Sequence, residues 1–176
     1  MGRRLPSDPR TLSGYTYVRA LGTGGFADVY LYEQSMPRRT IAVKVLLPDA
    51  VDGDLRTAFL QETTMLAQLA AHPSVLTMYE AGIAPDGRPF LVTEYCPSNY
   101  GDRFRRGPIP VPEVLSVGIA VGSVLETAHR ASVLHRDIKP ANILVTGYGK
   151  PVLAAFGIAP TVARARTEQR VGIPGP

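Results

Sequence analysis

Short runs of apolar and aromatic residues, separated by glycine- and proline-containing turns, fill the first half of the chain. Three of these runs lie at 15–21, 26–32 and 41–46, and the first two flank a glycine-rich connection, as in a β-hairpin. Two further strands are predicted over 75–79 and 90–95, because a Pro-Asp-Gly-Arg turn separates them. The pattern therefore predicts five strands.

Between the third and fourth predicted strands the hydrophobic period changes to that of a helix. Apolar residues recur there at helical intervals, at Leu55, Phe59, Leu66 and Leu69. Asp54 precedes them as a suitable N-cap. A longer helix is predicted over 112–130, after a turn-rich link at 97–110, and short strands follow around 143–145 and 152–153. The longer helix is apolar on most of its circumference, so we expect it to be buried on several sides.

Composition limits the classes of function. The chain has 176 residues, enough for roughly one domain, and 45% of them are hydrophobic. The net charge of +4 is too small to indicate a nucleic-acid partner, and the single cysteine cannot form an internal disulfide. The N-terminus does not resemble a signal peptide, and the longest uncharged apolar stretch, 114–125, is too short to span a bilayer. We therefore expect a cytoplasmic protein without a membrane segment.

A glycine-rich loop, Gly22-Thr23-Gly24-Gly25, connects the first two predicted strands. Glycines let backbone N–H groups approach phosphate oxygens closely, so the loop is a candidate phosphate-binding element. A hairpin turn also uses glycine, and the loop alone does not distinguish the two roles. It is not a dinucleotide-binding fingerprint, which joins a strand to a helix, and no Gly-Lys-Ser/Thr follows as in a Walker A loop.

A lysine, Lys44, lies inside the apolar third strand. A lysine in such a strand needs either a partner or an exposed face. Glu62 on the following helix is the natural counter-ion, and their ion pair would hold the ammonium ready for a nucleotide phosphate. An edge position with a solvated Lys44 is the alternative.

The third motif is the segment His135-Arg136-Asp137-Ile138-Lys139-Pro140-Ala141-Asn142, which has no helical or strand period. An aspartate in such a loop can accept a hydroxyl proton, and an asparagine carbonyl can bind a hard cation such as magnesium. The segment resembles the catalytic loop of eukaryotic-type (Hanks-type) protein kinases, H-R-D-L-x-x-x-N, with Ile138 in place of leucine. With Lys139 two residues after Asp137, the loop is similar to that of the serine/threonine subclass rather than the tyrosine subclass.

This resemblance extends from about Tyr15 to the C-terminus and implies a protein-kinase-like α+β fold. The fold would have a five-stranded N-lobe with one helix and an incomplete helical C-lobe. The corresponding division of the chain is a flexible arm over 1–13, the N-lobe over 14–96, and a partial C-lobe over 97–176. The C-lobe part would contain the catalytic loop and part of the activation segment.

The resemblance also implies roles for individual residues. Asp137 matches the catalytic base, Lys139 would lie near the transferred phosphate, and Asn142 matches a metal ligand. Thr93 matches the residue that guards the back of the nucleotide pocket, and the hinge begins at Glu94. The residues implied in ATP binding are Leu21, Gly22, Thr23, Gly24, Gly25, Val29, Ala42, Lys44, Glu62, Thr93, Glu94 and Cys96. ATP and Mg²⁺ would be the cofactors, and a protein substrate or signalling partner would be bound.

Two features depart from the family pattern. The metal-binding D-F-G motif is replaced by Ala155-Phe156-Gly157, and an alanine methyl cannot bind a cation, so weakened magnesium binding is expected. The chain also stops before an A-P-E motif, so we expect the helices that complete the larger lobe to be missing and self-association to result. Three interpretations remain open: an impaired serine/threonine kinase, a nucleotide-binding pseudokinase acting as a signalling or scaffold module, or a fragment of a longer kinase.

Overall fold

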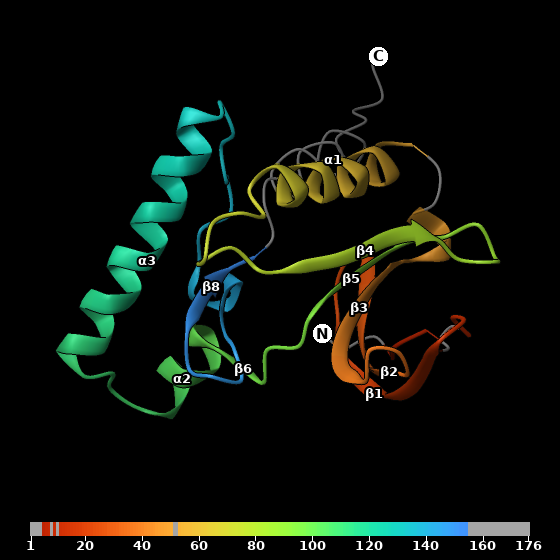
Figure 1. Ribbon diagram of the computed structural model, residues 1–176, viewed down its shortest axis with the longest axis horizontal. Helices are drawn as coiled ribbons and strands as arrows, with labels where there is room; N and C mark the ends of the chain where they lie inside the picture. The colour runs from red at the N-terminus through yellow and green to blue at the C-terminus, as the bar shows by residue number, and fades with distance from the viewer. Residues whose placement is uncertain (1–4, 8, 10, 51–52, 155–176) are drawn as a thin grey trace, which may run out of the picture.

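The computed structural model describes residues 5–7, 9, 11–50 and 53–154 (Figure 1). The strands in this part of the chain are β1 Tyr15–Thr23, β2 Ala27–Gln34, β3 Arg39–Leu46, β4 Met78–Ile83, β5 Pro89–Glu94, β6 Ser98–Asn99, β7 Ile143–Val145 and β8 Pro151–Leu153. The α-helices are α1 Asp54–Gln68, α2 Tyr100–Arg106 and α3 Val111–Arg130, and two 3₁₀ turns lie at Pro48–Ala50 and Pro140–Asn142.

The first five strands form one antiparallel sheet in the order β1-β2-β3-β5-β4, with α1 inserted between β3 and β4. The prediction of five strands and one helix is therefore confirmed. The fourth strand begins later than predicted, at Met78 rather than at Val75. Val75 instead forms an isolated parallel bridge with Leu153 of β8 and is buried. Its apolar character therefore reflects contact with the second part of the molecule and not membership of the sheet.

The two faces of the five-stranded sheet have different neighbours. Val29 lies opposite Lys44 and Ala42 lies opposite Thr93 in the strand register, so these four side chains share one face. Leu46 on this face packs with Phe59 and Leu66 of α1 in a single hydrophobic cluster. Alternate residues of the same strands point to the other face and form a second cluster. The nucleotide-binding candidates therefore lie on the face that α1 flanks.

The second face of the sheet is contacted by the segment that precedes β1. The sequence predicts a flexible arm over 1–13, but in its described part Leu12 is buried and belongs to the second cluster. Ser7 donates hydrogen bonds to Asp28 of β2. The described part of the arm is therefore docked on the sheet, because an apolar anchor and a polar anchor hold it.

The predicted link over 97–110 contains a helix, α2, that the turn-rich composition conceals. Asn99 caps this helix, because its Oδ1 accepts a hydrogen bond from the Asp102 N–H at 2.9 Å. Gly107 ends it with a φ of 147°. Seven residues between a capping asparagine and a glycine are too few for a hydrophobic period to become visible in the sequence.

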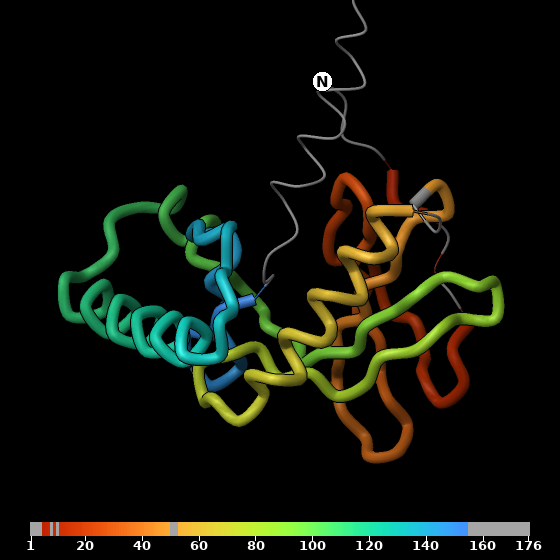
Figure 2. The backbone as a smooth tube through the Cα atoms, turned by 90° about the horizontal axis from the view of Figure 1, so that it is seen from above, coloured from red at the N-terminus to blue at the C-terminus, as the bar shows by residue number. Residues whose placement is uncertain are grey.

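Helix α3 begins and ends close to the predicted positions, but its predicted burial on several sides is wrong for the described residues. Only Val124 and Ala128 of this helix are buried, and they pack with Leu153 of β8 in one cluster. Ile119 remains 75% exposed. Figure 2 shows α3 at the end of the molecule opposite the five-stranded sheet. Within the described residues, its outward side is therefore an exposed apolar surface.

Among the described residues, α3 is the one helix long and apolar enough to cross a membrane. It has 20 residues, and an 18-residue window within it has a mean hydropathy of 1.4. The uncharged stretch 114–125 alone is too short for a span, whereas the whole helix runs from Val111 to Arg130. Length therefore does not exclude a span. This is weak support for one, because core helices of soluble proteins pass the same test.

Candidate active site

The glycine-rich loop closes the turn between β1 and β2. The Gly24 N–H donates to the Ala27 carbonyl oxygen at 2.8 Å, and a Cβ at position 24 would lie 2.9 Å from that same oxygen. The hairpin therefore requires glycine at position 24. A Cβ at Gly22 or Gly25 would meet nothing within 4 Å, so packing within the protein does not require glycine there. Close approach of a ligand to the backbone would explain these two glycines.

Lys44 and Glu62 form the ion pair that the sequence suggested. Lys44 Nζ lies 2.5 Å from Glu62 Oε2, and the side chain of Glu62 is only 5% exposed. Lys44 is on β3, which lies between β2 and β5, so the alternative of a solvated edge lysine is wrong. The ammonium also faces the rings of Phe26 and Phe59, whose centroids lie 5.4 and 5.7 Å away. Phe26 was not among the residues predicted for the site, although its place directly after Gly25 was a signal.

The chain is hydrogen-bonded at Glu94, the last residue of β5, and then leaves the sheet. The Glu94 N–H donates to the Thr77 carbonyl oxygen at 2.9 Å, and the Glu94 carboxylate accepts from the Thr77 N–H at 3.0 Å. Tyr95 to Pro97 lie outside the strands, so their backbone groups are not committed to a ladder. Burial, with the Glu94 charge, raises the pKa of Cys96 to about 12. Its thiol therefore stays protonated and is a poor nucleophile.

Two of the catalytic-loop candidates, Lys139 and Asn142, bind the carboxylate of the third, Asp137. Lys139 Nζ lies 2.7 Å from Asp137 Oδ2, and the Asn142 amide donates to the same oxygen at 2.9 Å and to the Asp137 carbonyl at 2.8 Å. Burial alone would raise the pKa of Asp137, but the hydrogen bonds from Lys139 and Asn142 outweigh it and leave the pKa below its ordinary value. Asp137 is therefore ionised at neutral pH.

His135 connects the catalytic loop to Ala154 through hydrogen bonds of its ring. It is buried, and burial lowers its pKa, so the ring is neutral at pH 7. The Asp137 N–H donates to Nδ1 at 3.3 Å, so we assign the ring hydrogen to Nε2, which lies 2.9 Å from the Ala154 carbonyl oxygen. The Ala154 N–H in turn donates to the Asn142 carbonyl at 2.9 Å. The residue before Ala155 is therefore fixed against the catalytic loop, while Ala155 itself lies outside the described residues.

The donor set for a metal ion is small. No group of three or more His, Cys, Asp or Glu side chains that could hold a metal occurs among the described residues. Both donated bonds of Asn142 come from its amide nitrogen, and no described group donates to its Oδ1. Asn142 Oδ1 therefore fits a single oxygen ligand, and the described residues provide no group of three or more such side chains that could complete a metal site.

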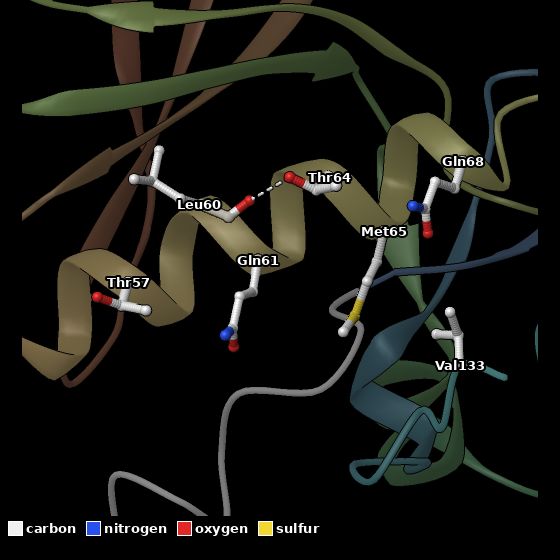
Figure 3. A pocket seen from close by; sticks show the side chains of 7 residues that line it. All are labelled: Thr57, Leu60, Gln61, Thr64, Met65, Gln68 and Val133. Atoms are coloured by element: carbon white, nitrogen blue, oxygen red, sulfur yellow. Dashed lines mark hydrogen bonds between the residues drawn. The ribbon is translucent and has the colours of Figure 1, made fainter.

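A pocket of about 370 Å³ lies between α1 and Val133. Figure 3 shows the side chains that line it. Its lining residues are Thr57, Leu60, Gln61, Thr64, Met65, Gln68 and Val133. None of them is a candidate site residue and none is charged. An anionic nucleotide would find no cationic partner there, so the region of Lys44 and Glu62 remains the candidate site.

A glycine loop between two strands, a strand lysine paired with a helix glutamate, and an Asp-x-Lys-x-x-Asn loop together define the class of protein kinases. The chain belongs to this family, because a family model described as "Protein kinase domain" matches residues 15–175.

The individual relatives are bacterial serine/threonine kinases. The chain is 42% identical over 159 residues to the serine/threonine-protein kinase PknK of Mycobacterium tuberculosis, covering 88% of this chain and 14% of PknK. It is 38% identical to PknF of the same organism, of which it spans 33%. The crystal structure of the M. tuberculosis PknI kinase domain, C20A mutant, superposes with a TM-score of 0.71 at 33% identity, covering 89% of this chain and 64% of that one. The chain therefore spans only part of each relative.

Proposed function

We propose that this chain is the nucleotide-binding and catalytic-loop part of a serine/threonine protein kinase, and that its phosphoryl transfer is weakened by Ala155. The observation that carries the proposal is the Asp137 carboxylate, which Lys139 and Asn142 hold through Oδ2 while no described group donates to Oδ1. That free oxygen is suited to orient a substrate hydroxyl and to accept its proton.

The other residues support the same reaction. Lys44, fixed by Glu62, presents a positive charge to the nucleotide phosphates, and the backbone at Gly22 and Gly25 leaves room for them. Lys139 adds a second positive charge beside the attacking hydroxyl. Asn142 Oδ1 would hold a magnesium ion, which, when bound, neutralises charge on the phosphates. Tyr95 to Pro97 would offer backbone groups to the adenine.

A second candidate function is a nucleotide-binding pseudokinase that signals through conformation or acts as a scaffold. One specific observation favours it: an alanine stands where the family has its metal-binding aspartate. The described residues contain no carboxylate cluster that could replace that ligand. The two candidates share the nucleotide site and differ only in whether phosphate is transferred.

A phosphate-transfer assay on a generic serine/threonine peptide tests the proposal. The unaltered chain is compared with Asp137→Asn, which keeps the side-chain size but removes the proton acceptor. We expect a slow transfer, below the roughly 1–100 s⁻¹ typical of kinases, that the Asp137→Asn variant loses. Equal signals from both chains would favour the pseudokinase, and a rate within the usual range would show that Ala155 does not impair transfer.

The exposed apolar side of α3 carries a separate prediction about solution behaviour. Val111, Leu115 and Ile119 are 70%, 61% and 75% exposed, and contiguous apolar patches of this kind promote association. We expect this chain to self-associate at micromolar concentrations in light scattering. The double variant Leu115→Glu and Ile119→Glu should reduce the association, whereas Ser116→Glu, at an exposed polar position of the same helix, should not. A monodisperse monomer of the unaltered chain would contradict the prediction.

A further inference from the structure

Helix α2 packs directly on the catalytic loop. A Cβ added at Gly101 would lie 3.2 Å from the backbone N and Cα of Ala141, which is closer than ordinary van der Waals contact, so a glycine suits this approach. Ala141 is the residue before Asn142, and the amide of Asn142 binds the Asp137 carboxylate. The position of α2 next to the proton acceptor is therefore set by a close backbone contact.

The side of α2 that packs on the catalytic loop continues beyond Gly101 as an exposed surface. Phe104 and Arg105 follow Gly101 by three and four residues, so they lie on the same side of the helix one turn further on. A helical side chain leans toward the N-terminus of its helix, and the Arg105 guanidinium does so in its ion pair with Asp102. Phe104 and Arg105 are both exposed. They are therefore accessible to a molecule that binds beside the catalytic loop.

The charges of this region do not balance. The stretches 100–113 and 135–142 together contain five arginine and lysine side chains but only three carboxylates. Each carboxylate already has a cationic partner, in the pairs Asp102–Arg105, Glu113–Arg103 and Asp137–Lys139. Among the described residues no ion-pair partner remains for the exposed Arg106. The region therefore carries an excess of positive charge next to the proton acceptor.

Arg103 and Arg105 differ in how easily they can change partner. The Arg103 guanidinium donates to Glu113 Oε2 of α3 at 3.0 Å and lies 5.2 Å from the ring centroid of Tyr100, so it joins α2 to α3. The pair of Arg105 with Asp102 lies within one turn of the same helix and is open to solvent, and such pairs contribute little to stability. Arg105 can therefore exchange Asp102 for a carboxylate of a bound peptide at small cost.

We propose that Arg105 and Arg106 are specificity-determining residues, and that the preferred substrate is a peptide with glutamate or aspartate residues close to the acceptor serine or threonine. The inference deepens the proposed function and rests on it for the location of the acceptor at Asp137. A peptide whose hydroxyl reaches Asp137 lies beside α2, because α2 packs on the catalytic loop. Its flanking carboxylates therefore meet the two guanidiniums, whereas a lysine-rich flank is repelled.

Fluorescence anisotropy with three labelled peptides tests this specificity. The peptides share a central serine and carry glutamates, glutamines or lysines on both sides of it. We expect the unaltered chain to bind the glutamate peptide most tightly and the lysine peptide least, and this preference should shrink in about 0.5 M salt because exposed charges are screened. Arg105→Gln combined with Arg106→Gln should reduce the preference for glutamate over glutamine about fivefold, a size typical of two exposed ion pairs.

A matched variant controls for the net charge of the chain. Arg130→Gln combined with Lys150→Gln also removes two exposed positive charges, and Arg130, like Arg105, forms an ion pair within its own helix. This variant should keep the preference, because neither residue is on α2 or on the catalytic loop. Charge reversal, Arg105→Glu combined with Arg106→Glu, should instead make the lysine peptide the tightest ligand. Thermal melting followed by circular dichroism checks that each variant is folded.

Three results would overturn the inference: equal affinity for the three peptides, no detectable binding of any of them, or an unchanged preference when both arginines are replaced by glutamine. Phosphate transfer to the glutamate peptide is measured separately. Preferential binding without any transfer would support the charge preference and count against the proposed kinase activity, so the failure of one is distinguishable from the failure of the other.

Discussion

Replacing Ala155 with aspartate is expected to raise the rate of phosphoryl transfer by on the order of 10²–10³-fold, the typical effect of one preorganised electrostatic group. The preceding residue, Ala154, is held next to the catalytic loop by hydrogen bonds with His135 and Asn142. A carboxylate at position 155 would add a cation ligand to Asn142, whereas the described residues contain no group of three or more His, Cys, Asp or Glu side chains that could hold a metal. The rate should therefore also become strongly dependent on the magnesium concentration.

Two controls make this result specific. Ala155→Asn has nearly the same size as aspartate but no charge, so it should gain much less rate. Ala155→Asp combined with Asp137→Asn should lose the gain, because the proton acceptor is missing. If Ala155→Asp transfers phosphate no faster than the unaltered chain, the absence of this carboxylate is not what limits the reaction, and the account of the impairment is wrong.

Replacing Lys44 with methionine is expected to weaken ATP binding by roughly 10- to 100-fold, the equivalent of about 1.5–3 kcal/mol for a hydrogen bond to a charged group. Methionine keeps an unbranched side chain of similar length but loses the charge that faces the rings of Phe26 and Phe59. Glu62, only 5% exposed, would then face the nucleotide phosphates without a counter-ion. Fluorescence titration with an ATP analogue measures the loss.

The unpaired Glu62 could also lower stability, so folding and binding are separated by a second variant. Lys44→Met combined with Glu62→Leu removes both charges, and we expect its thermal stability to recover while its nucleotide affinity does not. Lys150→Met, at an exposed position in the turn between β7 and β8, is the matched control and should bind ATP as the unaltered chain does. Restored affinity in the double variant would show that Lys44 acts on folding alone.

The residues whose local pattern carries their role were predictable from the sequence. The strands and α1 follow from hydrophobic period, and the pairing of Lys44 with Glu62 was one of two options for a lysine in an apolar strand, which needs a partner or an exposed face. Asp137, Lys139 and Asn142 lie within six residues, so a short loop brings them together whatever the rest of the fold does. The prediction of their roles rests on the resemblance and on this geometry.

The features that the sequence did not predict depend on contacts between distant segments. Val75 looked like the start of a strand because its apolar character was read locally, whereas it packs against Leu153. The burial of α3 was inferred from its apolar circumference, which does not say how much protein surrounds a helix. The contact of Ser7 with Asp28 joins residues that are 21 positions apart, and no local sequence pattern at either residue indicates this contact.

The measurement that tests the central claim most directly is a calorimetric titration of the unaltered chain with ATP, in the presence and in the absence of Mg²⁺. The claim is that the phosphate-binding Lys44, its partner Glu62 and the glycine-rich loop are intact while the main metal ligand is missing. It predicts that ATP binds in both conditions with similar affinity. A large gain in affinity on adding Mg²⁺ would contradict it, and the absence of binding in both conditions would show that the site does not bind ATP.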